Sequence, residues 1–279
     1  MIDRAVPPAE PSGETVASAR AILRRGLPGV RGSRPADRSR RPAMLVAAVV
    51  VLSLATAFLL PSLLTSGSSA SAALRELGVI AGRQAPVELP QGAFVYTKTV
   101  ALWQSCTLEG CEPREVTREA WIARDGSGRL VHDDDDWPSE RFGPGGLHFE
   151  NLSALPTDPR ALASVIEERV GDHPNGEYEV FVVVGDLLRE TYSSPELRRA
   201  LFEVAASLEG AELVGATTDG LGRPGIGVGY LDDGNLETLV FDERTSKVLG
   251  EKTEAPNGDV VSWSSVVASG VVGSVSERP

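Results

Sequence analysis

The sequence predicts an α+β fold: an antiparallel sheet, flat or curved, packed with a central block of helices and preceded by one transmembrane helix. Three observations lead to this prediction. Runs rich in β-branched and aromatic residues lie on both sides of a block with helical periodicity at about 157–208. Turn sequences such as Asp-Gly and Asn-Gly connect these runs directly, which favours antiparallel pairing. A charge-free apolar run at 43–64 precedes them all.

Composition and charge narrow the class of protein. The chain has 279 residues, of which 42% are hydrophobic and 24% charged, and this excludes a disordered or fibrous chain. Residues 1–42 hold nine Arg and four acidic residues, a net charge of +5, whereas the remainder holds 18 basic and 35 acidic residues, a net charge of −17. Nucleic-acid binding needs a basic surface that displaces counterions. We therefore expect no nucleic-acid partner.

The apolar run at 43–64 has the length of a transmembrane helix, since about 20 residues cross a hydrocarbon core of ~30 Å. Arg38, Arg40 and Arg41 lie directly before it, and no basic residue follows until Arg75. Positive charge accumulates on the cytoplasmic side of a span. We therefore expect a single-pass protein of the plasma membrane, with a cytoplasmic N-terminus and an extracytoplasmic C-terminal domain.

Two questions about this anchor stay open in the sequence. A signal peptide cleaved after Ala72 is the alternative to a retained anchor, although the apolar run is longer than the 7–15 residues of an ordinary signal. The Arg-rich tail, residues 1–42, is either a juxtamembrane segment held near anionic lipid or a docking site for a cytoplasmic regulator. The second reading uses a short amphipathic helix at 13–26. In both, the lipid bilayer is the partner of residues 43–64.

After the anchor, residues 65–92 are expected to form a linker and a short helix that ends at Gly82. Three strands are then predicted from β-branched and aromatic residues, at 93–100, 116–123 and 129–132. Asp125-Gly126 is the hairpin turn between the last two. Residues 133–156 are expected to form an acidic surface loop rich in Gly and Pro.

The central block contains three predicted helices. The first begins at Thr157-Asp158-Pro159, where Thr or Asp caps the helix and Pro suits its first position. The second covers about 179–191, although its valine-rich run at 180–184 also suits a strand. The third begins at Ser194 and ends before Gly210.

Strands resume after this block, at 211–217, 225–230, 236–241, 247–252 and 260–263. Turn residues between them indicate a meander. The extracytoplasmic domain is thus expected at 93–273, followed by a C-terminal tail at 274–279.

Cys106 and Cys111 lie between the first two predicted strands. Outside the membrane they meet an oxidising environment, and a turn that includes Gly110 brings them within disulfide reach. We expect a disulfide that staples the end of a hairpin. A redox-active pair is disfavoured because the spacing is not Cys-x-x-Cys at a helix start, and a zinc site lacks nearby His ligands.

Other motifs predict little chemistry. The run His132–Asp136 offers clustered carboxylates for a hard cation such as Ca²⁺, but the spacing of an EF-hand is missing and a solvated acidic loop is favoured. Gly220–Gly225 matches G-x-G-x-x-G, yet no helix follows it and Pro224 removes a donor, so we interpret it as a hairpin turn. The sequence contains no P-loop lysine, G-x-S-x-G or H-E-x-x-H. We expect no enzyme, no catalytic residue, no metal site and no cofactor.

Several short runs carry a resemblance to a known family: Ala154–Pro159, Gly185–Thr191, Leu197–Leu201, Gly222–Gly225, Phe241-Asp242, Thr245 and Leu249-Gly250. Together with the Arg-rich tail, the single span and the aromatic pair Phe94 and Tyr96, they make the chain resemble an uncharacterised family of actinobacterial single-pass membrane proteins. Members are often encoded beside extracytoplasmic-function sigma factors, and the resemblance therefore implies a role in envelope signalling. The family offers no catalytic or binding residue to transfer.

The order of strands, helices and strands is also similar in layout to LolA and RseB envelope domains, where a curved antiparallel sheet wraps helices and holds lipid or a regulatory partner. Two functions are therefore compared: a non-enzymatic binding or sensing module, and a carrier or sensor of a lipid or other apolar ligand. Inner-face residues are expected on the helices, at Leu187, Leu188, Leu197, Leu201 and Val204, and on the strands, at Val214, Val228 and Val240. These either fill an ordinary core or line a cleft for the ligand.

Overall fold

The structure is a computed structural model and describes residues 69–107, 110–133, 139–144, 149 and 151–279. The expected transmembrane segment at 43–64 and the cytoplasmic tail at 1–42 lie outside these residues. Within the described ranges, no helix combines the length and the apolar character that crossing a bilayer requires.

The described residues form one antiparallel sheet of nine strands, in the order β4-β3-β2-β1-β9-β8-β7-β6-β5. The strands are β1 (Phe94–Thr107), β2 (Gly110–Ala123), β3 (Gly128–His132), β4 (Glu140–Phe142), β5 (Ala211–Thr218), β6 (Pro224–Asp232), β7 (Asn235–Phe241), β8 (Val248–Glu254) and β9 (Val260–Val272). The last strand, β9, pairs with β1 and so joins the strands before the helical block to those after it. The predicted α+β class with an antiparallel sheet is confirmed.

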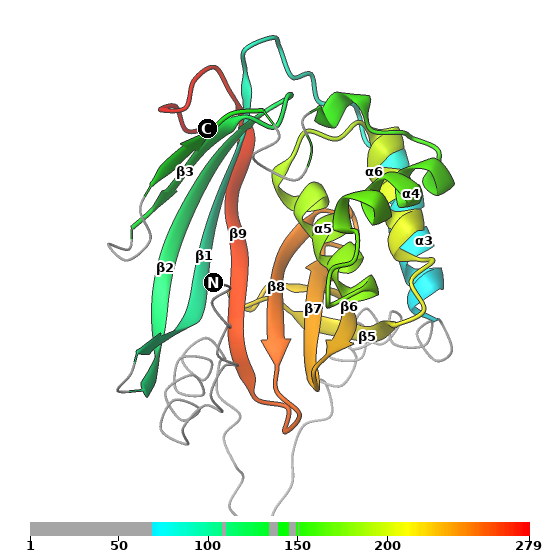
Figure 1. Cartoon of the computed structure of the whole chain (residues 1–279), viewed down its shortest axis with the longest axis vertical. Helices are drawn as coiled ribbons and strands as arrows, with labels where there is room; N and C mark the ends of the chain where they lie inside the picture. The colour runs from blue at the N-terminus through cyan, green and yellow to red at the C-terminus, as the bar shows by residue number, and fades with distance from the viewer. Residues whose placement is uncertain (1–68, 108–109, 134–138, 145–148, 150) are drawn as a thin grey trace, which may run out of the picture.

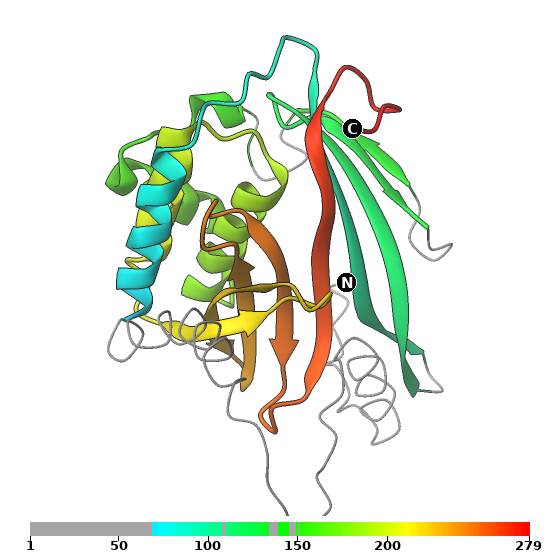
Figure 2. The same ribbon diagram turned by 180° about the vertical axis from the view of Figure 1, so that it is seen from behind.

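Four α-helices pack against this sheet in the described part of the chain. They are α3 (Ala70–Gly82), α4 (Pro159–Val170), α5 (Glu177–Glu190) and α6 (Pro195–Ala205). Figures 1 and 2 show the helices together on one side of a curved sheet, beside the half formed by β5 to β8. We call this side of the sheet concave and the opposite side convex. The other half, β1 to β3, extends away from the helices.

The helix starts in the central block follow the capping residues of the sequence. Asp158 Oδ1 accepts hydrogen bonds from the backbone N–H groups of Arg160 and Ala161, at 3.1 and 2.9 Å, and the helix begins with Pro159. The Ser194 hydroxyl accepts one from the N–H of Leu197 at 3.2 Å. Each cap satisfies backbone donors that have no partner in the first turn of a helix.

The valine-rich run that suited either a strand or a helix is helical. In α5, Val180, Val183, Val184 and Leu187 recur at helical spacing, and all four are buried in the core. Their burial against the sheet and the neighbouring helices outweighs the weak preference of valine for strands, because packing rather than propensity supplies most helical stability in proteins.

The core lies between the helices and the concave side of the sheet. The five inner-face helical residues expected from the sequence are all buried there: Leu187, Leu188, Leu197, Leu201 and Val204. Helix α3 contributes Leu74 and Leu77 to the same cluster, and it packs along α6. The two helices approach closely at Gly78, where an added Cβ would lie 3.0 Å from the Cβ of Phe202.

Of the three strand residues predicted to lie on the inner face, two face the opposite side, so the prediction was wrong for them. Val228 on β6 pairs with Leu239 on β7, and both belong to the core beneath the helices. Val240 pairs with Gly227 and therefore points to the convex side. Val214 directly follows Leu213, which packs against the core, and therefore faces the same convex side, beside Gly227. The irregularity at Leu213/Gly215 in β5 then places Gly215 opposite Gly227, so that two consecutive residues of β5 oppose one residue of β6.

The loop expected at 133–156 was partly wrong. It contains a short edge strand, β4, and a 3-10 helix at Leu152–Ala154. β4 forms because Phe142 pairs with Gly128 on β3 and packs against the core. The strands β1, β2 and β9 are also longer than expected. β1 and β2 continue to the hairpin end at Thr107 and Gly110, and β9 continues to Val272.

Candidate functional site

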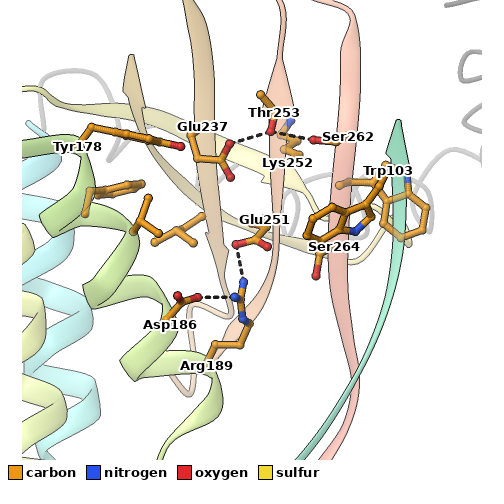
Figure 3. A pocket seen from close by; sticks show the side chains of 14 residues that line it. Trp103, Tyr178, Asp186, Arg189, Glu237, Glu251, Lys252, Thr253, Ser262 and Ser264 are labelled. Atoms are coloured by element: carbon orange, nitrogen blue, oxygen red, sulfur yellow. Dashed lines mark hydrogen bonds and ion pairs between the residues drawn. The ribbon is translucent and has the colours of Figure 1, made fainter. Parts of the chain in front are cut away.

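A pocket of about 370 Å³ lies between α5 and the concave side of the sheet. Figure 3 shows its lining: Tyr178 lies on the helix side, Trp103 on the far side, and carboxylates and hydroxyls between them. This volume falls within the range of small-ligand pockets, roughly 300–1,000 Å³.

The lining residues face the pocket because of the helical repeat of α5 and the side-chain alternation of the paired strands. On α5, Tyr178, Val182, Asp186 and Arg189 follow each other at intervals of three or four residues and so share one helix face. On the sheet, cross-strand pairing aligns two rows of side chains on the concave side. One row is Glu237, Thr253 and Ser262, and the other is Leu239, Glu251 and Ser264.

Arg189 is the charged centre of the pocket. Its guanidinium forms ion pairs with Asp186, at 2.5 Å, with Glu190, at 3.0 Å, and with Glu251 on β8, and its side chain is only 10% exposed. Burial lowers the pKa of Arg189, but the carboxylates of Glu251, Glu190 and Asp186 more than offset this, so that its pKa lies above its ordinary value. The arginine therefore stays charged and holds α5 against β8.

Glu190 connects this centre to the other half of the sheet. Arg118 on β2 donates two hydrogen bonds to Glu190, Nη1 to Oε1 at 2.6 Å and Nη2 to Oε2 at 2.9 Å. Burial raises the pKa of Glu190, and the charges of Arg118 and Arg189 outweigh this and lower it to about 2. The carboxylate is therefore ionised over the whole physiological range of pH.

The pKa of Glu237 is shifted in the opposite direction from that of Glu190. It accepts a hydrogen bond from the Thr253 hydroxyl at 2.7 Å, and the Ser262 hydroxyl donates to Thr253 at 2.9 Å. Burial is the main cause that raises the pKa of Glu237 to about 7, and the nearby Glu251 carboxylate adds to the effect. The pocket thus contains one carboxyl group that changes its protonation state near neutral pH.

The lining combines aromatic side chains with fixed charges. No His or Cys is among the described residues that line the pocket, so its Ser262 and Ser264 hydroxyls have no imidazole base beside them there. Within the described ranges, no group of three or more His, Cys, Asp or Glu is arranged to hold a metal ion. Aromatic walls beside fixed charges can hold a ligand in one orientation.

The site residues expected from the sequence lie elsewhere. Cys106 and Cys111 are directly opposite one another in the register of β1 and β2, and their disulfide stays a prediction. His132 ends β3, and Asp133 accepts a hydrogen bond from the Thr117 N–H at 2.6 Å, whereas residues 134–136 of the acidic run lie outside the described residues. The run at Gly220–Gly225 spans a hairpin turn between β5 and β6, as expected.

The pocket itself was missed in the sequence, although one signal pointed to it. α5 is otherwise apolar in its second half, and Asp186, Arg189 and Glu190 interrupt it at a spacing that places them together. Charges within a buried helix need partners from other elements. The strand residues Glu237 and Glu251 carry no comparable signal, because an acidic residue in a strand ordinarily faces water.

No protein-family model matches the chain, and no curated protein matches it either. Among solved structures, the chain is similar to MucB in complex with the periplasmic part of MucA, at 17% identity over 75% of this chain and 57% of that chain, with a TM-score of 0.31. A Pseudomonas aeruginosa MucA/MucB complex matches at 12% identity over 72% and 56%, with a TM-score of 0.27. MucB alone matches at 13% identity over 75% and 60%, also with a TM-score of 0.27. The chain thus spans less than two thirds of each of these chains.

Proposed function

We propose that this chain is a non-enzymatic, single-pass membrane protein whose extracytoplasmic domain binds a protein partner in envelope signalling. The charge-free run at 43–64 behind an Arg cluster supports the anchor and its orientation. The Arg-rich tail at 1–42 is then available to a cytoplasmic regulator. The pocket beside α5 supports the binding function.

The position of this pocket carries the proposal. It lies between α5 and the strands β7, β8, β9 and β1, and its far wall is Trp103, which is 42% exposed. A large exposed aromatic side chain beside fixed charges is typical of the residues that dominate protein interfaces. The extended β1–β2 half offers a surface next to the pocket along which a partner segment can lie.

The charges of the pocket favour a partner that presents a basic side chain. Asp186, Glu251 and, when it is ionised, Glu237 are the acidic groups of the lining, and Arg189 is paired with Asp186 and Glu251. Lys252 also borders the pocket, but its ammonium is held by Thr217 at 3.0 Å and by Glu254 at 3.4 Å. Complementary charge at such a site orients the partner, and it excludes competing proteins whose charge has the same sign as the pocket.

A carrier of an apolar ligand is the alternative function, and Phe181, Val182 and Leu239 give the pocket an apolar wall that favours it. The charged lining counts against it. A lipid chain placed here would remove water from Asp186 and Glu251 without offering them a hydrogen bond, and desolvating charges in this way is costly.

Site-specific photo-crosslinking tests the two functions. A benzoylphenylalanine at Trp103 in the full chain, irradiated in its native membrane, is expected to give a protein adduct of discrete mass. The matched control carries the same probe at Leu231 on β6, which is 54% exposed, and is expected to give no such adduct. A lipid adduct at position 103 would favour the carrier, and equal labelling at both positions would refute a specific site.

The cytoplasmic partner is tested separately by co-purification with the full chain and with a chain that lacks residues 1–42. Loss of a cytoplasmic protein from the shortened chain is the expected result. An unchanged set of partners would contradict a regulator at the tail while leaving the extracytoplasmic site unaffected.

A further inference from the structure

A second built site lies on the convex side of the sheet. Tyr96 on β1 and Trp121 on β2 are cross-strand partners, with ring centroids 5.2 Å apart, and each is only 1% exposed. Glu119 and Arg129 point to the same side, because Glu119 lies two residues before Trp121 on β2 and Arg129 pairs with Trp121 from β3. We call these four side chains the convex cradle.

The cradle is covered by the last residues of the sequence rather than by a helix. Figures 1 and 2 show the segment after β9 turning back beside β3, at the end of the sheet away from the helices. Val275 packs against the cluster of Tyr96, Trp121 and Val272. The Gly273 N–H donates to the Glu277 carboxylate at 2.7 Å, which closes the segment into a compact turn.

Arg278 makes the most specific contact with the cradle. Its Nε and Nη2 donate to Glu119 Oε1 and Oε2, both at 2.6 Å, and its guanidinium lies 5.6 Å from the Trp121 ring centroid. The Tyr96 hydroxyl also donates to Glu119 Oε1, at 2.5 Å. The Arg278 hydrogen bonds are the main cause that lowers the pKa of Glu119 to about 2. A planar, forked cation above an aromatic ring fits this geometry, and a lysine ammonium does not reproduce it.

The cradle also recognises the backbone of the segment. Trp121 Nε1 donates to the carbonyl of Glu277 at 2.8 Å, and Arg129 Nη1 donates to the carbonyl of Val275 at 3.2 Å. The side chains of Trp121 and Arg129 thus donate to alternate carbonyls of the segment. The Glu119 carboxylate binds the Arg278 guanidinium, which is partly exposed to water. These contacts are those of a peptide-binding site, in which backbone bonds give affinity and one side chain gives specificity.

We propose that the convex cradle is a binding site for an arginine-bearing peptide segment, which residues Val275–Arg278 of the same chain occupy in cis and which a segment of like chemistry from another protein takes in exchange. The recognising side chains all belong to paired strands, so the cradle persists when the segment leaves. The Arg278 side chain is 56% exposed, so the occupant is held at its edge and can be displaced.

Whether a segment of another protein replaces Val275–Arg278 depends on the advantage that the cis segment has from being tethered to the site. A segment joined to the site by a short linker has an effective concentration in the millimolar range. A free peptide of the same sequence therefore binds the native chain poorly, and weakening the cis segment exposes the site.

The test measures fluorescence anisotropy of a labelled peptide with the sequence of residues 272–279 against the full chain. We expect the Arg278→Ala chain to bind it at least tenfold more tightly than the native chain, because the competing guanidinium is gone. Arg244→Ala, a change at another exposed arginine, is the matched control and is expected to leave binding at the native level. Adding Glu119→Gln to Arg278→Ala is expected to abolish the gain.

A second comparison needs no further change in the chain. Against Arg278→Ala, peptides that carry Lys or Ala in place of the arginine are expected to bind at least tenfold more weakly than the arginine peptide. Equal binding of the three peptides would overturn the proposal, as would equal binding of the arginine peptide to the native chain and to Arg278→Ala. Thermal unfolding of each variant checks that it is folded.

Discussion

Arg118 on β2 and Glu190 at the last turn of α5 form a two-pronged ion pair across 72 residues of sequence, with the Glu190 side chain only 3% exposed. This pair joins the end of α5 to the β1–β2 half of the sheet. Glu190 also binds Arg189, which binds Glu251 on β8. The pocket therefore lies beside an ion-pair network that spans both halves of the sheet.

Arg118→Ala is expected to lower the free energy of unfolding by about 3 kcal/mol, because it leaves a buried carboxylate with one of its two cations. The measurement is a urea titration of the purified protein. The matched control is Arg75→Ala, whose ion pair with Glu203 spans 3.5 Å and whose side chain is 56% exposed. Exposed pairs contribute about 0–1 kcal/mol, so comparable losses in the two variants would contradict the structural role of Arg118.

Leu201→Ala is expected to lower the free energy of unfolding by about 2–5 kcal/mol, since Leu201 is fully buried among the helices and the sheet. Leu231→Ala removes the same atoms from a side chain that is 54% exposed and is expected to change stability by less than about 0.5 kcal/mol. If Leu201→Ala left stability nearly unchanged and a co-purifying lipid were lost, the residue would line a ligand cleft instead.

Because of the raised pKa of Glu237, the free energy of unfolding is expected to fall as the pH rises. This pKa is raised from 4.5 to about 7 in the folded state, so the folded chain holds a proton there that the unfolded chain has released. The stabilisation from this group is complete below pH 4.5 and is lost as the pH rises to 7, by up to about 3 kcal/mol.

Urea titrations at pH 5 and pH 7.5 measure this effect, and Glu237→Gln isolates it. The amide resembles the protonated carboxyl and does not titrate, so the variant is expected to lose less stability than the native chain between the two values. Glu119 and Glu190 do not interfere, since their pKa values of about 2 lie far below this window. Identical pH dependence in both proteins would show that Glu237 is not the cause.

The proposed topology predicts an asymmetric response to protease. When protease is added to intact spheroplasts, the C-terminal domain is expected to be digested and a tag before residue 1 to be spared, because the Arg38, Arg40 and Arg41 cluster stays in the cytoplasm. Lysed cells are the control, in which both are cut. Digestion of the tag in intact spheroplasts would reverse the orientation.

The disulfide follows from this topology and from the strand register. Cys106 and Cys111 are cross-strand partners, and directly opposed Cα atoms in antiparallel strands are about 4.5–5.5 Å apart, within the range of a disulfide. Mass spectrometry of unreduced peptides is expected to find them linked. Reduction is expected to cost no more than roughly 2–3 kcal/mol, because the closed loop is short. Free thiols in protein taken from the native envelope would reject the bond.

Features that depend on neighbours in the sequence were predictable. The caps at Asp158 and Ser194 and the turn at Gly220–Gly225 involve groups within a few residues of each other, so their physical cause is present in the sequence itself. The alternation of hairpin-linked strands with a helical block likewise predicted the α+β class.

The tertiary structure alone decided which side each strand residue faces and which distant groups meet. Val214 faces the convex side because the neighbouring Leu213 pairs with Val228 and packs against the core, and side chains along a strand alternate with a period of two. The raised pKa of Glu237 and the contact of Arg278 with Glu119 arise from strand pairs and burial far apart in sequence. The sequence by itself therefore determined the local elements and the class of fold, whereas the pocket and the convex cradle exist only because long-range register brings their charges together.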